Sequence, residues 1–331
     1  MAVGLATALV TALAACSGSP AESPAPPTGS ANSVRAPATG VGATSAASTG
    51  AQAASPAPSA ASVSPAGWKA CGTTTCKSAT TPGAALAAIL AEDRPLVVGF
   101  GEAHAQKGSE EIASTAWRAT NELFGELGGK ASDLVLELWI ADPKCAPKAQ
   151  AKVEKQQKQV TQTQAASNTN EYVVLAEKAK ALGIQPHVIR PTCAEVDKLA
   201  KAGDDAVLEM LSMITEHMQK QVADLRSKPA AKDKIVLTYG GAMHNDLRPA
   251  EGREGWSFGP AVDAATDHRY VEIDLVVPEY VKDTPAWTGQ RWYAGHLATT
   301  SDAGTTVIKS GERSYAIVMP RGVKRPRTAS E

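Results

Sequence analysis

The sequence predicts an α/β fold with a mostly parallel central sheet flanked by helices on both faces, preceded by a disordered tether. Two observations predict it. From residue 83 onward, short apolar runs of strand length alternate with amphipathic segments of helix length, and this alternation is typical of parallel strands joined by crossover helices. The first 67 residues, by contrast, combine a short apolar leader with a long stretch of small and polar residues.

The expected elements follow one another in strand–helix order. A short helix over 83–91 leads to a strand over 96–100, and Ser109 is the expected N-cap of a helix that runs to Leu127. Further strands are expected at 134–140, 184–189, 235–239, 270–277, 305–309 and 315–319, and further helices at 171–182 and across 194–227. The last strands can be antiparallel at one edge. The polar stretch 148–170 predicts a solvated helix or a mobile excursion.

The leader is read as a secretion signal. Residues 3–15 are apolar and end in Leu13-Ala-Ala-Cys16, and this run is too short to span a bilayer. The end resembles the bacterial lipobox, which implies that residues 1–16 are a lipoprotein signal peptide and that Cys16 is lipidated. No Lys or Arg precedes the apolar run, so the usual basic segment of a signal peptide is missing. An ordinary cleaved signal with an incidental Cys16 stays open as the alternative to the lipobox. The lipid anchor implies a location in the cell envelope, at the periplasmic face of the outer membrane or at the cell surface.

Three further regions follow the leader. Residues 17–67 consist mainly of Ser, Ala, Pro, Thr and Gly, with Glu22 and Arg35 as the only charges. Such a composition offers too little apolar surface to offset the entropy of ordering, so a disordered tether is expected. Residues 68–320 form the expected α/β domain, and residues 321–331 a frayed basic tail.

The overall charge restricts the partners. A formal net charge of −1 and a sequence pI of about 6.6 give no indication of the strongly basic face that nucleic-acid binding requires. We therefore expect a small-molecule or peptide ligand and no nucleic acid. The sequence does not indicate an oligomeric state.

The cysteines agree with export. Besides Cys16, four remain, and an even number in an exported chain favours disulfides. Cys71 and Cys76 bracket a short loop, while Cys145 and Cys193 each follow a predicted strand. Neighbouring parallel strands would bring the latter two together, so the expected pairs are Cys71–Cys76 and Cys145–Cys193. A zinc site is the alternative, but the chain has no CxxC pair.

A strand that ends in glycine, followed three positions later by histidine, occurs twice. The first is LVVGFGEAH, ending at His104, and the second is IVLTYGGAMH, ending at His244. The loops at the carboxyl ends of parallel strands share one edge of a sheet, where ligands bind. Glycine would let the backbone turn sharply there. Both histidines are therefore candidate site residues.

Two carboxylates join these histidines. Glu102 lies in the first turn, and Glu137 stands inside the apolar strand LVLELWI, where a buried carboxylate needs a partner. His104, His244, Arg190 or a cation would serve as that partner. His104, Glu137 and His244 make an acceptable ligand set for a divalent metal of the zinc or manganese class, with Glu102 positioning or deprotonating a water. Without a metal, the same four residues can supply a general base and its orienting acid.

Structural roles remain open for the same residues. Ordinary loops also use Gly and His, and Glu137 can form a structural ion pair with Arg190. Asn245 and Asp246, which follow His244 directly, are the expected groups that fix its tautomer.

These motifs resemble the superfamily of Tiki and TraB proteins, erythromycin esterases and ChaN-type haem-binding lipoproteins. GEAH, LVLELW and YGGAMH are similar to its two GxxH motifs and its glutamate-bearing strand, most closely in the ChaN branch. The resemblance covers about residues 96–277 and places Glu102, His104, Glu137 and His244 on the motif positions. Erythromycin esterases have a longer spacing, Gly-Glu-x-x-His, which this chain lacks.

Two functions follow as expectations. One is divalent-metal-assisted hydrolysis of a peptide, ester or amide by an envelope-anchored lipoprotein, with Glu102, His104, Glu137 and His244 as catalytic residues. The alternative is a ChaN-like haem-binding lipoprotein in iron acquisition, in which Tyr239, His244 or a residue of the aromatic segment 287–293 binds the haem iron. A non-catalytic envelope module with the same fold is a third, weaker possibility.

Overall fold

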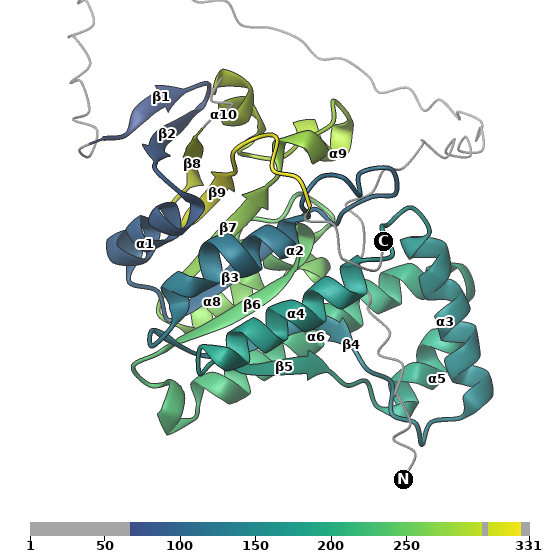
Figure 1. Cartoon of the computed structure of the whole chain (residues 1–331). Coiled ribbons are helices and arrows are strands. Elements are labelled where there is room, and N and C mark those ends of the chain that lie inside the picture. Colours follow the sequence, from purple (N-terminus) through teal and green to yellow (C-terminus); the bar gives the residue numbers. More distant parts are fainter. Residues whose placement is uncertain (1–66, 300–303, 326–331) are drawn as a thin grey trace, which may run out of the picture. The chain divides into compact units, whose positions relative to one another are not determined.

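The computed structural model describes residues 67–299 and 304–325 (Figure 1). The expected signal peptide with Cys16, the tether up to residue 66 and the end of the basic tail lie outside the described residues. Within the described residues the centre is a nine-stranded sheet in the order β1-β2-β8-β9-β7-β3-β6-β4-β5. Helices cover it on both sides, as the sequence predicts.

The middle of the sheet is parallel. β3 (Val97–Glu102) lies between β6 (Ile235–Gly241) and β7 (Tyr270–Val276), and both pair with it in parallel. On the far side of β6, β4 (Ala131–Trp139) and β5 (Gln185–Ile189) continue the parallel arrangement. The expected parallel strands are thus confirmed, and their carboxyl ends share one edge.

The other side of the sheet is mostly antiparallel. β9 (Ser314–Val318) runs parallel to β7, whereas β8 (Thr305–Gly311) runs antiparallel to β9. Beyond β8 lies a hairpin that the sequence analysis missed, formed by β1 (Lys69–Cys71) and β2 (Thr74–Ala79). Both strands are short and mostly polar, so they carry no apolar periodicity that a sequence pattern could detect.

The helices form a layer on each face. α1 (Pro82–Asp93), α2 (Thr115–Arg118) and α4 (Asn168–Ala181) lie in front of the sheet in Figure 1, with α6 (Ala206–Arg226) and α8 (Gly259–Ala265) behind it. Each layer has its own apolar core. Alternate residues of β3 feed the two cores, with Phe100 in the first and Val97 in the second, as the period of two in a strand requires.

Two expected helices differ in detail. The polar stretch 148–170 contains α3 (Pro147–Thr161), which packs against α5 (Cys193–Lys201) and buries Val153. The helical region expected across 194–227 is divided into α5 and α6 by a short 3-10 turn that begins at Gly203, where φ is +61°.

The helix expected to start at Ser109 starts later. Its N-cap is Ser114, whose hydroxyl accepts a hydrogen bond from the Trp117 amide at 3.0 Å. After α2 the chain continues as a π-helical turn and a 3-10 turn. Ser109 instead donates to the carbonyl of Gln106 at 2.6 Å.

The contacts of residues 323–325, in the basic tail, explain why this helix starts later than expected. The Ala113 amide donates to Val323 at 3.0 Å, Arg325 donates to Glu111 at 3.0 Å, and Ile112 forms an antiparallel bridge with Lys324. Ile112 and Ala113 are therefore held in an isolated bridge to residues 323–324 and lie outside the helix. Residues 321–325, expected in a frayed tail, belong to the folded body.

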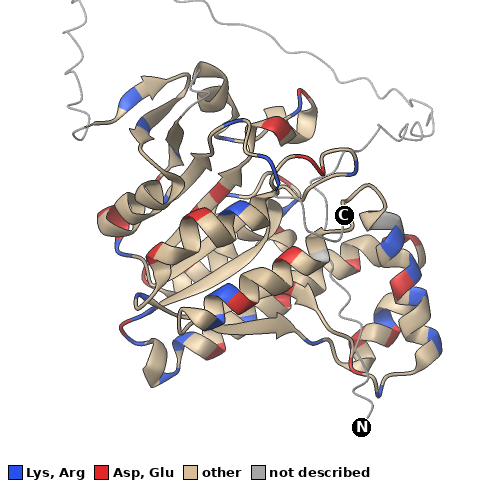
Figure 2. Ribbon diagram, in the orientation of Figure 1, with Lys and Arg blue, Asp and Glu red and all other residues tan. Residues whose placement is uncertain are grey.

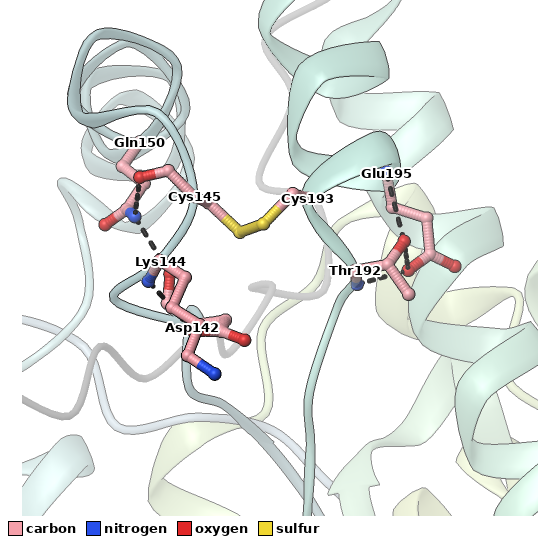
Figure 3. The surroundings of a disulfide bond; sticks show 7 residues. All are labelled: Asp142, Lys144, Cys145, Gln150, Thr192, Cys193 and Glu195. Atoms are coloured by element: carbon pink, nitrogen blue, oxygen red, sulfur yellow. Dashed lines mark hydrogen bonds between the residues drawn. A yellow bond between two sulfur atoms is a disulfide. The ribbon is translucent and has the colours of Figure 1, made fainter.

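Both expected disulfides are present. Cys71 and Cys76 join the two strands of the β1–β2 hairpin, with 5.8 Å between their Cα atoms. Cys145 and Cys193 are joined with a Cα separation of 5.0 Å. Figure 3 shows that this bond links the segment after β4 to the beginning of α5, where Thr192 and Glu195 form a capping box. The pairing confirms that β4 and β5 deliver their following loops to the same end of the sheet.

The charged residues lie mainly on the helices and loops (Figure 2). Acidic and basic residues are interspersed over the helices and loops in Figure 2, while the strands are largely uncharged. In the part of the chain that the structure describes, no helix is both long and apolar enough to cross a membrane.

Candidate functional site

The four predicted site residues lie at the carboxyl ends of neighbouring strands. Glu102 is the last residue of β3, and His104 follows two positions later. β6 ends at Gly241, and His244 lies in the single turn α7 (Ala242–Asn245). The parallel register pairs Glu102 with Gly241. Glu137, from β4, accepts a hydrogen bond from the Gly241 amide at 2.6 Å, which ties the third strand to the same edge.

These side chains form two pairs. In the first pair, Nδ1 of His104 lies 2.7 Å from Oε1 of Glu102. In the second, Nε2 of His244 lies 3.7 Å from Oε1 of Glu137. All four residues are buried, with exposed fractions of 4% or less.

Two tyrosines hold Glu102 in place. The Tyr172 hydroxyl, from α4, donates to Oε1 of Glu102 at 3.0 Å, and the Tyr239 hydroxyl, from β6, donates to Oε2. With donors at both oxygens, Glu102 acts as an acceptor, so Nδ1 of His104 is the atom that carries the ring proton. Glu102 therefore fixes both the orientation and the tautomer of His104.

Both tyrosines keep their protons. Burial and the negative charge of Glu102 raise the pKa of Tyr172 and of Tyr239 well above the ordinary range. Glu137 raises the pKa of Tyr172 further, so this phenol lies within electrostatic reach of both carboxylates. The two pairs are thus electrostatically connected through Tyr172.

His244 is oriented from its other side. Its Nδ1 lies 2.9 Å from the carbonyl oxygen of Trp256 and 3.0 Å from the hydroxyl of Thr215. A carbonyl oxygen can only accept, so Nδ1 carries the proton and Nε2 points toward Glu137. Among the described residues, neither Nε2 of His244 nor Oε1 of Glu137 has a hydrogen-bond partner. Two buried polar atoms thus face one another without a hydrogen bond.

Gly101, the glycine of the first motif, and Gly240, which directly precedes the glycine of the second, lie close to carboxylates. A Cβ on Gly240 would lie 2.5 Å from Oε2 of Glu137, and one on Gly101 would lie 2.5 Å from Oδ1 of Asp274. Neither glycine has a positive φ. A left-handed conformation is therefore not what requires glycine here; Gly101 and Gly240 make room for carboxylates that reach across from neighbouring strands.

Several sequence-based expectations about the site need correction. Arg190 is exposed and is not the partner of Glu137; of the expected partners, His244 is the one that faces it, at 3.7 Å. Asn245 does not fix His244; it donates to Phe100 and accepts from Thr238.

His104, the expected third metal ligand, does not join Glu137 and His244. In the described ranges, no three His, Cys, Asp or Glu side chains lie in a group that could hold a metal ion. Glu137 and His244 therefore face one another as two ligand-type groups, whereas His104 belongs with Glu102.

The residues considered for haem are differently placed. Tyr239 is fully buried, and its hydroxyl is bonded to Glu102. In the aromatic segment 287–293, Trp292 is buried and donates from its indole nitrogen to Asp274 at 2.9 Å. Haem binding by Tyr239 and His244 would require uncovering both side chains and breaking these contacts.

Three residues of the site were missed by the sequence analysis. Tyr172, Thr215 and Trp256 orient the motif residues from α4, from α6 and from the loop after α7. Tyr172 lies on the buried face of a helix that the sequence predicts. This position in a predicted helix is the only feature of the sequence that could have indicated it. Thr215 and Trp256 belong to no motif.

Comparisons with known proteins add little to this geometry. The sequence matches no family model and no curated protein. Among solved structures, a Bacillus cereus protein aligns with 75% of this chain and 95% of its own, with 10% identity and a TM-score of 0.34. That similarity is too low to carry an argument.

One cavity borders the site, and a second lies next to the first. One, of about 30 Å³, is lined by Glu102, Ala242, Asp274 and residues of α9 (Pro285–Thr288). The other, of about 380 Å³, lies beyond Asp274. Asp274 lines both, so it separates the Glu102 side of the sheet edge from a larger polar space.

Proposed function

We propose that this chain hydrolyses a peptide, ester or amide bond, with a divalent cation held by Glu137 and His244 and with His104 as the general base. The observation that carries this proposal is the pair of buried, facing atoms, Oε1 of Glu137 and Nε2 of His244, 3.7 Å apart and without hydrogen bonds among the described residues. The proposal agrees with the resemblance of the motifs to the Tiki-like superfamily.

The chemistry of this pair fits a cation. Nδ1 of His244 is committed to Trp256, so Nε2 directs a lone pair at a carboxylate oxygen unless a proton or a cation lies between them. Zinc bonds to imidazole nitrogen and carboxylate oxygen at about 2.0–2.2 Å. Two such bonds at an ordinary coordination angle separate the ligand atoms by roughly 3.4–3.7 Å. The observed 3.7 Å lies at the upper end of this range, which supports one shared ion of the zinc or manganese class.

The Glu102–His104 pair supplies the base. Because Nδ1 of His104 donates to Glu102 at 2.7 Å, Nε2 carries the lone pair that accepts a proton from water. Tyr172 and Tyr239 hold Glu102 and so act as positioning residues. A bound divalent cation would acidify a water and polarise the carbonyl of the substrate.

The setting is the cell envelope. We propose that Cys16 is lipidated and anchors the chain, with residues 17–67 as a tether. The two disulfides support an oxidising compartment. In that setting the substrate is a small molecule or peptide outside the cytoplasm.

Metal analysis tests the cation site. Full-length wild-type protein, loaded with Zn²⁺ or Mn²⁺ and then dialysed, is expected to retain about one equivalent. Glu137→Gln and His244→Gln are expected to lose it. His187→Gln is the matched control, because His187 forms a 2.7 Å pair with Asp133 at the outer strands β4 and β5.

Turnover tests the base. A p-nitrophenyl ester and a peptide p-nitroanilide are the probe substrates. The expected result is a rate that His104→Ala lowers by at least about a hundredfold and that a chelator abolishes in the wild type. Protein that retains no cation, with turnover indifferent to both the chelator and His104→Ala, would overturn the proposal.

A further inference from the structure

The base of the proposed reaction is closed off from solvent. The side chain of His104 is 0% exposed, and that of Glu102 is 2% exposed. A general base must lie within hydrogen-bond reach of the proton that it takes, and the water that loses this proton must reach the substrate. Some element beside His104 therefore has to move before a substrate can enter.

The segment that joins α3 to α4, residues 162–167, lies against the loop that follows His104. We call it the lid segment. Two backbone hydrogen bonds join it to this loop, from the Ala165 amide to the Ala105 carbonyl at 2.8 Å and from the Lys107 amide to the Thr163 carbonyl at 2.9 Å. Between these bonds, Gln106 and Gln164 form an isolated antiparallel bridge. The lid segment thus packs directly on the residues next to the proposed base.

Few buried contacts hold the lid segment. Of its residues, Ala165 alone belongs to the apolar core on that face, and Gln162, Thr163 and Ala166 are exposed. Asn168, at the start of α4, adds one side-chain hydrogen bond to the Ala105 carbonyl at 3.1 Å. Segments with few buried apolar contacts open locally at low free-energy cost, without unfolding of the rest. The lid segment is therefore the part of the cover that moves most readily.

The opposite end of α3 is held firmly. Cys145 lies just before α3 and is bonded to Cys193, and α3 packs against α5 (Figure 1). With 15 residues, α3 is about 22 Å long, so the disulfide is far from the lid segment. The lid segment can therefore lift from residues 105–107 while the beginning of α3 stays in place.

We propose that the lid segment opens to admit a substrate to His104 and closes over it during turnover. Closure of this kind removes bulk water from a reaction and commits the substrate. The inference rests on the role of His104 in the proposed function, whereas the opening itself can be measured without turnover.

A disulfide across the bridge locks the lid segment. The two backbone hydrogen bonds flank Gln106 and Gln164, and antiparallel pairs of this type have Cα atoms about 4.5 Å apart. A disulfide requires about 4.4–6.8 Å. The test variant is therefore Gln106→Cys/Gln164→Cys in the full-length protein, in its oxidised and reduced forms. Gln106→Ser/Gln164→Ser is the matched control, because it removes the same side chains without forming a bond.

Chemical modification measures access to His104. Diethyl pyrocarbonate modifies accessible histidines, and mass spectrometry locates the modified residue. His104 is expected to react in the wild type, in the serine control and in the reduced variant, and at least about tenfold more slowly in the oxidised variant. His268, whose side chain is 70% exposed, is the internal control and should react equally in all forms. Equal rates at His104 in the oxidised and reduced forms, or no reaction in the wild type, would overturn the inference.

Hydrogen exchange measures whether the opening is local. The amides of Lys107 and Ala165 each donate across the bridge. They are expected to exchange at least about a hundredfold faster than the amides in the middle of β3 and β6. If they were protected as strongly as the sheet, the lid segment would open only when the whole protein unfolds, and it would not be a lid.

Turnover of the p-nitrophenyl ester separates the lid from the proposed function. The oxidised variant is expected to lose at least about tenfold in rate, and reduction is expected to restore it. Wild type taken through the same reduction controls for the native disulfides. Full turnover by the oxidised variant would contradict the lid. A wild type that turns over neither probe substrate contradicts the proposed hydrolysis instead, and the lid is then decided by the reactivity of His104.

Discussion

Tyr239 and Glu102 stand on neighbouring parallel strands, and the tyrosine hydroxyl donates a hydrogen bond to the glutamate carboxylate. Tyr172 donates to the same carboxylate from α4 at 3.0 Å. Glu102 is therefore held by the sheet and by a helix at once, and His104 takes its orientation from Glu102. The proposed base therefore depends for its position on two buried tyrosines.

Replacing Tyr239 with phenylalanine is the direct test of this relationship. The change leaves one buried oxygen of Glu102 without its donor, which costs about 1–3 kcal/mol in the free energy of unfolding. Hydrolysis of the ester probe is expected to fall at least about tenfold, because His104 loses its fixed position. Tyr315→Phe is the control, since Tyr315 is buried and bonds to Glu92 away from the site. An equal loss of turnover in both variants would contradict the positioning role.

The tyrosines also predict how the protein behaves in alkali. Burial raises the pKa of Tyr172, Tyr239 and Tyr270 well above the ordinary range, and that of Tyr280 to about 12. Unfolded tyrosine loses its proton near pH 10, so the free energy of unfolding should fall as the pH rises above about 10. In a spectrophotometric titration, the phenolate of these residues should appear together with the loss of the circular dichroism signal. If the native protein instead showed a gradual rise in phenolate absorbance near pH 10 that accounts for all six tyrosines, the prediction would be contradicted.

Stability should also decline from acid toward neutral pH. Burial, and then the nearby charge of Glu272, raises the pKa of Asp246 to about 8, and the pKa values of Glu272 and Asp274 are raised in the same direction. Unfolded Asp titrates near pH 4. Between these values the native state binds protons that the unfolded state releases, so the free energy of unfolding falls as the pH rises from about 4 to about 8.

Asp274→Asn isolates one part of this effect. The variant should be more stable than the wild type at pH 8, by about 1–3 kcal/mol, and this advantage should shrink at pH 5. Thermal unfolding followed by circular dichroism at the two pH values measures it. The same advantage at both pH values would show that the carboxyl group of Asp274 does not titrate as described.

The two disulfides should differ in their contribution to stability. Cys145–Cys193 spans 48 residues and Cys71–Cys76 spans 5. Restricting the unfolded chain over these loop lengths contributes about 4 and about 2 kcal/mol, respectively. Denaturant unfolding of Cys145→Ser/Cys193→Ser and of Cys71→Ser/Cys76→Ser should show the larger loss in the first variant. The opposite order would mean that loop length does not dominate.

Gly240 should tolerate no side chain. A Cβ there would lie 2.5 Å from Oε2 of Glu137 and 2.7 Å from its Cβ, so Gly240→Ala should displace Glu137. We expect a loss of about 1–3 kcal/mol in stability together with the loss of cation retention. Gly125→Ala is the matched control, because no described atom lies within 4 Å of its added Cβ. Normal cation retention by Gly240→Ala would separate the glycine from the site.

The sequence predicted the middle of the sheet and the motif residues for a clear physical reason. Buried parallel strands are continuous apolar runs, and a glutamate inside such a run, like Glu137, is conspicuous because it needs a partner. The pairing of Cys145 with Cys193 followed from the same strand order. These features depend on local composition, which a single sequence displays.

The remaining features depend on contacts between distant segments. The start of α2 at Ser114 reflects pairing of residues 111–113 with residues 323–325, which no local pattern reveals. Likewise, Thr215 and Trp256 orient His244 from elements with ordinary sequences. The four expected site residues form two pairs because of the side-chain geometry at the strand ends. A sequence motif gives the positions of residues along the chain and does not specify this geometry.

The contact between residues 111–113 and the end of the described chain has a consequence for biosynthesis. Residues 323–325 are synthesised after every strand of the described sheet, the last of which ends at Val318, so a growing chain can form this contact only after the whole sheet has been made. Closing this contact is therefore a late step of folding.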